Sequence, residues 1–320
     1  MSAAAKRPPV FAIAAAAVAV TAIVWFVFVR GSSDAPALQS AFPAVAALND
    51  GAPPKNDAPP ERRPSPFVAP QDAAVASVRD LCASEKWTDA RAAIARLFAG
   101  DLPDESRAEL ATLAGRVHDR LFAPPGAPDL ELYEIVSGDN LTKIAQRFKH
   151  LKGCYGAIMV LNDIKDPNAT LRLGRKLRVP KGAWSLVVDK SLFTLWICYE
   201  GAPIRSYRVA IGRDEKTPAG TFTVGNKNPK PAWYPPQEMI ADLKKDGVPI
   251  PIPYGHAKNP LGEYWIALDH KEHQGLGIHG TNDPASIGTR ASNGCIRMDN
   301  KEVMMIAWTA APGTAATIVE

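Results

Sequence analysis

A cysteine near the C-terminus stands among residues that suit nucleophilic chemistry. In the stretch "ASNGCIRM", Cys295 follows Ser292, Asn293 and Gly294 and precedes Arg297. A free thiol has a pKa of about 8.5 and is mostly protonated at neutral pH, so a thiol nucleophile needs a base beside it. These residues predict a cysteine nucleophile. The alternative is a buried, inert thiol, which is the commoner state of a cysteine.

The sequence also supplies a base and oxyanion donors. His279, followed by Gly280, precedes the cysteine by sixteen positions, so loop geometry rather than helix spacing must bring the two together. The imidazole can take the thiol proton, while Arg297 adds positive potential. Consecutive backbone N–H groups of Gly294 and Cys295 on a sharp turn can stabilise an oxyanion. The pattern predicts acyl transfer, although a Cys/His pair alone is a weak signal.

A metal site is the competing interpretation. His256, His270, His273 and His279 fall within 24 residues, and three histidines suffice to bind zinc. However, the spacing is not HExxH, and the stretch 269–273 has the composition of a polar turn. We therefore expect loop histidines, no metal and no cofactor.

The elements around these residues are predicted to be mainly strands. From Trp184 onward the runs "SLVVD", "LFTLWICY" and "PIRSYRVAIG" alternate with short turns, which indicates a β-meander. Helix signals are confined to 236–245 and 302–309. The sequence thus predicts a mainly-β domain over residues 184–320.

Residues 132–181 are predicted to form a small βααβ module. "YEIV" is a short strand, Asn140 can cap a following helix, and a second helix covers 155–161. The closing "LRVP" is again strand-like. This pattern predicts a compact domain preceding the β-rich one.

The N-terminal third has three different compositions. An apolar run at residues 10–29 follows Lys6 and Arg7, and twenty helical residues rise about 30 Å, enough to cross a bilayer. We expect residues 1–30 to be a cytoplasmic tip and an uncleaved transmembrane anchor, with a cleaved signal as the alternative. Residues 31–70 contain nine prolines and nine alanines, which predicts a disordered linker.

Residues 71–123 carry apolar positions at helical spacing, which predicts two or three short helices in a hairpin-like segment. Its expected role is that of a spacer or a contact for a protein partner. A net charge of +4 is too small and dispersed to indicate nucleic-acid binding. The four cysteines form no CxxC pair, so we expect no obligatory disulfide framework.

The βααβ segment resembles a LysM carbohydrate-binding domain through "YEIVSGDNLTKIAQRF", "VLND" and "LRLGRKLRVP". It departs at Asn140, where that family more often has threonine. The resemblance implies binding of N-acetylglucosamine-containing glycans, with Gly138, Asp139 and Asn162 as candidate contacts. The alternative is that these three residues only shape the loops.

The C-terminal domain resembles the catalytic domain of the YkuD-type L,D-transpeptidases, which cross-link peptidoglycan. The resemblance rests on "TPAGTF", "NPLG" and "IHGT…SIGTRASNGCIRM" in that order. It implies that Cys295 attacks the carbonyl of the third residue of a tetrapeptide stem and releases the terminal D-alanine. The acyl group then passes to an amine of another stem, giving a 3→3 cross-link.

The resemblance also implies roles for the neighbouring residues. His279 is the expected general base, and a carbonyl such as that of Gly280 orients its imidazole. Gly294 contributes an oxyanion N–H, Arg297 positions charged groups of the substrate, and Ser292 fixes the turn. The expected partners are peptidoglycan glycan strands and peptide stems, together with the cytoplasmic membrane through residues 10–29, so the bulk of the chain is expected in the periplasm or on the outer face of that membrane.

Asn293 departs from the family pattern, which has histidine there. Asparagine cannot exchange a proton near neutral pH but can hydrogen-bond. Two alternatives to the transpeptidase therefore stay open: an L,D-carboxypeptidase that passes the acyl group to water, and a catalytically weak peptidoglycan-binding scaffold.

Overall fold

The structure is a computed structural model that describes residues 68–100, 102–123 and 127–320. The predicted anchor at 10–29 and most of the predicted linker lie outside these residues. Within the described part of the chain, no helix has the length and apolar character needed to cross a membrane. The predicted linker, residues 31–70, ends too late in the sequence, because the first helix begins at Val68. Pro70 is tolerated there, since N–H groups in a first helical turn have no acceptor within the helix.

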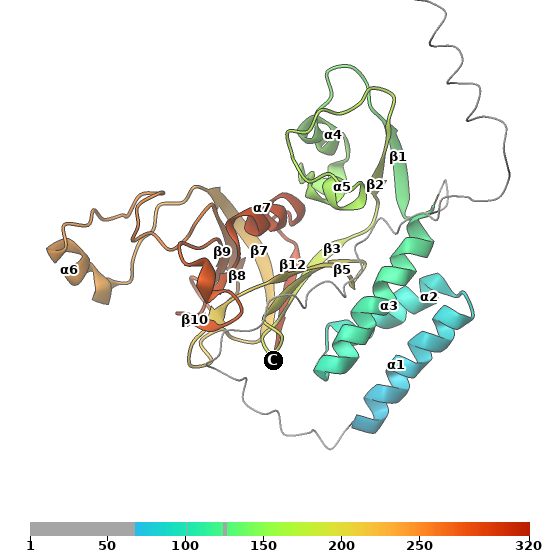
Figure 1. The fold of residues 1–320 in the computed structure, drawn as a ribbon, viewed down its shortest axis with the longest axis horizontal. Helices are drawn as coiled ribbons and strands as arrows, with labels where there is room; N and C mark the ends of the chain where they lie inside the picture. Colours follow the sequence, from blue (N-terminus) through green and yellow to red (C-terminus); the bar gives the residue numbers. More distant parts are fainter. Residues whose placement is uncertain (1–67, 101, 124–126) are drawn as a thin grey trace, which may run out of the picture. The chain divides into compact units, whose positions relative to one another are not determined.

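Three helices form the N-terminal part of the described chain (Figure 1): α1 (Val68–Ala83), α2 (Trp87–Phe98) and α3 (Asp104–Phe122). The segment thus contains three helices, within the two or three predicted. Its core includes Ile94, Phe98 and Leu110, none of which is exposed. Arg107, also fully buried, forms an ion pair with Asp189 of the β-rich domain.

The second module is a two-stranded sheet with two helices, as predicted. It contains β1 (Leu130–Glu134), α4 (Leu141–Arg147), a 3₁₀ turn (Lys149–Leu151), α5 (Gly156–Leu161) and β2 (Lys176–Pro180). The strands pair antiparallel, and the Asn140 side chain accepts the Lys143 N–H as the predicted cap of α4. The first strand ends at Glu134 instead of running to Val136, because the Val136 N–H turns to the Asp139 carboxylate.

The C-terminal domain is mainly β, which confirms the predicted class. Its eight-stranded sheet has the order β11-β9-β8-β7-β12-β3-β4-β5. These strands are β3 (Trp184–Asp189), β4 (Thr194–Tyr199), β5 (Ala202–Arg208), β7 (Gly220–Pro229), β8 (Tyr264–Asp269), β9 (Gly277–His279), β11 (Ile296–Arg297) and β12 (Ala315–Val319). A separate parallel pair joins β6 (Ile211–Gly212) to β10 (Arg290–Ser292).

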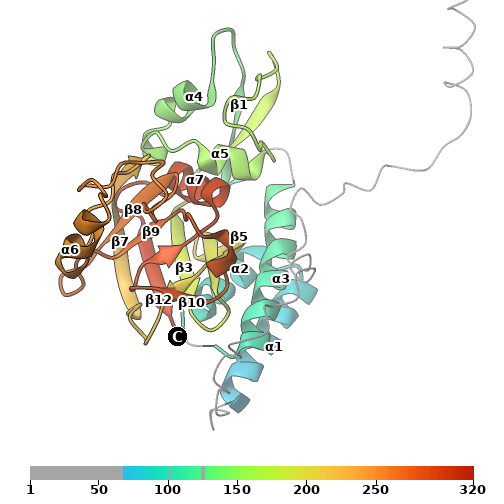
Figure 2. The ribbon, with the colours of Figure 1, turned by 60° about the vertical axis from the view of Figure 1, so that its left-hand side comes forward.

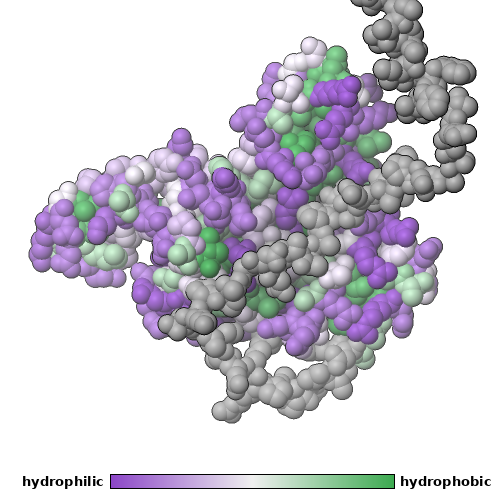
Figure 3. Space-filling model, in the orientation of Figure 1, coloured by the Kyte–Doolittle hydropathy of each residue, from purple (hydrophilic) through white to green (hydrophobic). Residues whose placement is uncertain are grey.

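Three short helices complete this domain: α6 (Gln237–Lys245), a 3₁₀ turn (Pro284–Ser286) and α7 (Asn300–Thr309). Helix α7 lies against the sheet in both ribbon views, whereas α6 stands out from it (Figures 1 and 2). Most of the α6 surface is hydrophilic in Figure 3, and Leu243 is the helix's one buried residue.

The burial of strand β4 shows the structural role of helices α1, α2 and α3. Every residue of β4 is buried, and because side chains alternate along a strand, both of its faces must be covered. Leu195 and Ile197 point into the core shared with α7, while Trp196 and Cys198 pack with the apolar residues of α1, α2 and α3. The helices therefore use their apolar faces to cover the second face of the sheet.

Candidate active site

Strand pairing brings the predicted nucleophile and base together. Strands β9 and β11 are parallel neighbours with Arg297 opposite His279, so the turn that carries Cys295 enters β11 beside β9. Cys295 and His279 line the same pocket, of about 500 Å³. The sixteen-residue separation is thus bridged by the pairing of β9 with β11, and not by loops alone as the spacing had suggested.

The surroundings of His279 favour a neutral imidazole. Its Nδ1 lies 2.7 Å from the Gly280 carbonyl oxygen, and since a carbonyl only accepts, Nδ1 carries the proton and Nε2 is left to accept one. The Trp265 ring stacks on the imidazole with centroids 5.8 Å apart. Burial lowers the pKa of His279 to about 4, although the Gly280 carbonyl works in the opposite direction. The predicted contact between Gly280 and the imidazole is present.

Cys295 is a partly exposed thiol. Its Sγ lies 3.6 Å from the Gly275 carbonyl oxygen. Burial raises the pKa of the thiol, and a backbone hydrogen bond from Gly277 and the charge of Arg297 only partly offset that rise. Both pKa directions favour a neutral thiol and a neutral imidazole at pH 7.

Ser292 fixes the turn before the nucleophile. Its buried hydroxyl accepts the Gly294 N–H at 3.0 Å and donates to the Cys295 carbonyl at 2.6 Å. This corrects the prediction for Gly294: its N–H is used inside the turn and is not directed at substrate. The Cys295 N–H remains as the oxyanion donor expected from this turn.

The backbone conformation at position 294 requires glycine. Its φ is +129°, and a Cβ atom there would lie 3.0 Å from the Lys216 carbonyl oxygen. A larger residue would therefore strain the backbone and push the nucleophile's turn away from its neighbour.

Asn293 is exposed and hydrogen-bonded to Arg213, a residue that no motif indicated. The Asn293 Oδ1 accepts from Arg213 Nη2 at 3.0 Å. Asn293, which stands where the family has histidine, thus forms a hydrogen-bonded pair with Arg213 at the rim of the site.

Asn300 is a second residue that sequence reasoning missed. Its Oδ1 accepts the N–H groups of Glu263 and Thr281, and its Nδ2 donates to the Thr281 carbonyl. These bonds tie the end of the "NPLG" turn to the loop that leaves His279. No local pattern marks such a role, because the three segments are distant in sequence.

The Arg297 side chain is half-buried in the same pocket. Its Nε has no hydrogen-bond partner among the described residues, although it is shielded from water. An unpartnered guanidinium N–H beside the nucleophile suits a negatively charged or carbonyl group of a substrate.

Two pockets meet at the nucleophile. The first is lined by aromatic and apolar side chains, including those of Trp233, Leu261 and Trp265. The second, of about 450 Å³, is lined by polar groups that include Glu215 and Glu272. Cys295 and Asn293 line both of them.

Comparison with known proteins decides the family. Residues 183–319 match the L,D-transpeptidase catalytic domain, YkuD, and residues 133–180 match the LysM domain. The putative L,D-transpeptidase YqjB of Bacillus subtilis is 36% identical over 138 residues, which cover 42% of this chain and 70% of that protein. The chain belongs to the L,D-transpeptidase family. The predicted class, a cysteine acyltransferase of this family preceded by a LysM domain, is confirmed.

Another relative of this L,D-transpeptidase extends the similarity. The putative L,D-transpeptidase YkuD of Bacillus subtilis is 29% identical over 193 residues, which cover 58% of this chain and 97% of that protein. Among solved structures, an L,D-transpeptidase from Mycobacterium smegmatis has a TM-score of 0.34 and 19% identity, with 46% of this chain and 64% of that chain covered.

His256, His270 and His273, the other histidines of the zinc alternative, lie on loops. His270 and His273 stack on each other with centroids 5.0 Å apart, and His256 accepts the Lys258 N–H within its own turn. Among the described residues, no three histidine, cysteine or acidic side chains are grouped as metal ligands would be.

In the LysM domain, the candidate glycan contacts hold the loops. The carboxylate of Asp139 accepts from Tyr133, Val136 and Arg147. The amide of Asn162 donates to two carbonyls and accepts the Arg178 N–H, and Gly138 has a φ of +85°. These contacts account for all three residues as loop-forming, and glycan contact by them stays a prediction.

Proposed function

We propose that this L,D-transpeptidase forms 3→3 peptidoglycan cross-links through a thioester on Cys295. The Cys295 thiol gives its proton to His279 Nε2 as Sγ attacks the carbonyl of the third residue of a tetrapeptide stem. The Cys295 N–H stabilises the oxyanion, and collapse expels D-alanine, whose amine takes the proton from the imidazolium.

An amine of a second stem then attacks the thioester. His279 takes the proton of this amine, and the resulting imidazolium returns a proton to the sulfur as it leaves, which restores the thiol. The neutral state of the Cys295–His279 pair supports both halves of this cycle, because the same imidazole must accept a proton twice.

Two pockets meet at Cys295, and this observation favours transfer of the acyl group to an amine over its hydrolysis by water. Water needs no binding pocket, whereas a second stem does. The carboxylate of Glu272 favours a cationic amine in the second pocket, while the aromatic first pocket suits the donor stem. Arg297 is the candidate contact for charged groups of the donor.

The proposed setting is the cell envelope. A LysM domain next to the catalytic domain supports retention on glycan strands. The apolar run at residues 10–29 supports an anchor in the cytoplasmic membrane, with the bulk of the chain in the periplasm or on the outer face of that membrane. The carboxypeptidase and the inactive scaffold are the competing functions.

Incubation of the full chain with a disaccharide-tetrapeptide, followed by mass spectrometry, tests this function. We expect loss of D-alanine and a cross-linked dimer, with no product from Cys295→Ser. Glu272→Gln should reduce dimer relative to monomeric tripeptide, because the cationic acceptor is held less well. Tripeptide without dimer would support the carboxypeptidase, and no product at all would support the scaffold.

A further inference from the structure

The peptide unit between Gly294 and Cys295 is held from behind by a distant threonine. The hydroxyl of Thr217 donates to the Gly294 carbonyl at 2.6 Å, and Thr217 is 1% exposed. That carbonyl and the Cys295 N–H belong to one planar trans peptide, so they point in opposite directions. A bond that fixes the carbonyl therefore fixes the direction of the N–H that faces the oxyanion.

The Thr217 hydroxyl has one orientation available. Its Oγ1 accepts the Gly212 N–H at 2.7 Å, so its lone proton is committed to the Gly294 carbonyl. The main chains at Gly212 and Gly294 are in close contact, because a Cβ atom on Gly212 would lie 2.9 Å from the Gly294 Cα. The segment 212–217 and the turn at Gly294, which are far apart in sequence, thus meet at this hydroxyl.

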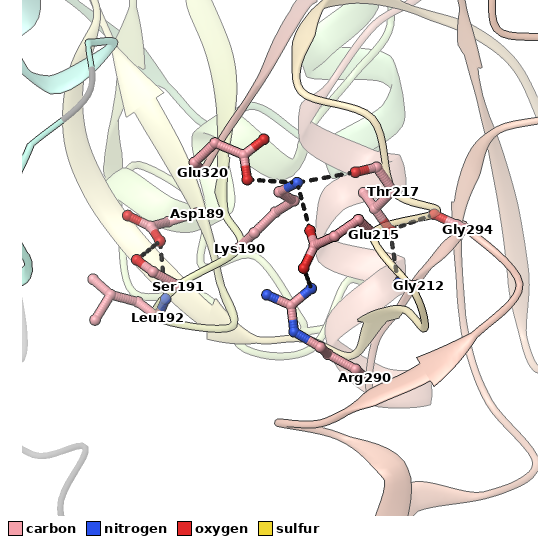
Figure 4. A network of polar contacts seen from close by, with 10 residues as sticks. All are labelled: Asp189, Lys190, Ser191, Leu192, Gly212, Glu215, Thr217, Arg290, Gly294 and Glu320. Atoms are coloured by element: carbon pink, nitrogen blue, oxygen red, sulfur yellow. Dashed lines mark hydrogen bonds and ion pairs between the residues drawn. The ribbon is translucent and has the colours of Figure 1, made fainter. Parts of the chain in front are cut away.

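Lys190 holds the main chain of Thr217 in turn (Figure 4). Its buried Nζ donates to the Thr217 carbonyl at 3.2 Å and pairs with the carboxylates of Glu215 at 3.2 Å and Glu320 at 2.7 Å. Glu215 also pairs with Arg290 at 2.7 Å. The ammonium is therefore compensated, which lets a buried charge serve as a fixed support.

We infer that Thr217, supported by Lys190, is a positioning residue that aims and polarises the Cys295 N–H for oxyanion stabilisation. This inference rests on the proposed function, since it concerns the acylation step. A hydrogen bond accepted by a peptide carbonyl also strengthens the N–H of the same unit as a donor. Both side chains are buried, so we expect them to act through the Cys295 N–H rather than by contact with the substrate.

Two reactions of the same thiol separate this role from a general structural one. Acylation by the tetrapeptide needs the oxyanion donor, whereas alkylation by iodoacetamide needs only the thiol and passes through no oxyanion. In the full chain, Thr217→Val should slow acylation about 10- to 100-fold, somewhat less than the roughly 100- to 1000-fold lost with an oxyanion donor. Alkylation should keep the wild-type rate, and Thr217→Ser should restore acylation.

Thr223→Val is the matched control. It makes the same substitution at an exposed position of β7, away from the turn that carries Cys295. Equal loss of both reactions in a folded Thr217→Val chain, or no loss of acylation, would overturn the inference. If that variant does not fold, Lys190→Gln decides: a selective but smaller loss of acylation supports the role, and any other result rejects it. A wild-type chain that is alkylated but never acylated contradicts the proposed function and this role together.

Discussion

The charge state of the catalytic pair gives a prediction that two pH profiles can check. Burial gives His279 a pKa of about 4 in place of 6.5, so charging the imidazole in the free enzyme costs about 3 kcal/mol more than in water. The pKa of the Cys295 thiol moves the opposite way, above its ordinary value. A thiolate–imidazolium pair is therefore disfavoured before substrate binds.

Alkylation of Cys295 reports its thiolate. An ordinary cysteine is a few per cent thiolate at pH 7, and Cys295 should be less. The alkylation rate should rise about tenfold per pH unit from pH 6 to 8, without a plateau, as expected below the pKa of a thiol. Cys82, Cys154 and Cys198 are buried, so a Cys295→Ser chain supplies the background rate.

Acylation reports the neutral base. Since His279 must be unprotonated to accept the thiol proton, the acylation rate should be flat at neutral pH and fall only as pH drops through about 4. Stopped single-turnover reactions with the tetrapeptide, analysed by mass spectrometry, give this profile. A plateau in alkylation between pH 5 and 7, or an acid limb of acylation near pH 6.5, would refute the neutral pair.

Three further predictions concern stability and the rim of the site. Arg107→Met should lower the free energy of unfolding, measured in urea, by about 3–5 kcal/mol, because it leaves the buried Asp189 carboxylate without its ion-pair partner. Arg79→Met, which removes an exposed ion pair with Glu109, is the control. His118 is buried with a pKa of about 4, so it should contribute a loss of folding stability as pH falls from 6.5 toward 4, about 2 kcal/mol at pH 5. His118→Phe should remove this contribution and leave the similar one of His279. An unchanged pH dependence in His118→Phe would contradict this account. Asn293→His should change the acylation rate less than about tenfold, the ordinary value of one hydrogen bond, because His279 carries the proton; a larger gain would mean that residue 293 takes part in proton transfer.

Local signals were sufficient for most of the fold. Alternation of apolar residues located β3 and β4, helical spacing located α2 and α3, and the Asn140 cap placed the start of α4. These features depend on neighbours within a few residues, so they are present in the sequence itself. The start of α1 at Val68 was missed, because a Pro/Ala-rich composition hides a helix that is completed by packing.

The active site divides in the same way. The sequence by itself determined that the chain carries a cysteine, a histidine and an arginine with the spacing of one enzyme family, and hence the reaction class. Only the tertiary structure decided which backbone N–H is free for the oxyanion, since the Ser292 hydroxyl takes that of Gly294. It also decided that Thr217, 77 residues away, holds the other side of the same turn. Such partners are selected by the packing of distant segments, which leaves no periodic trace in the chain.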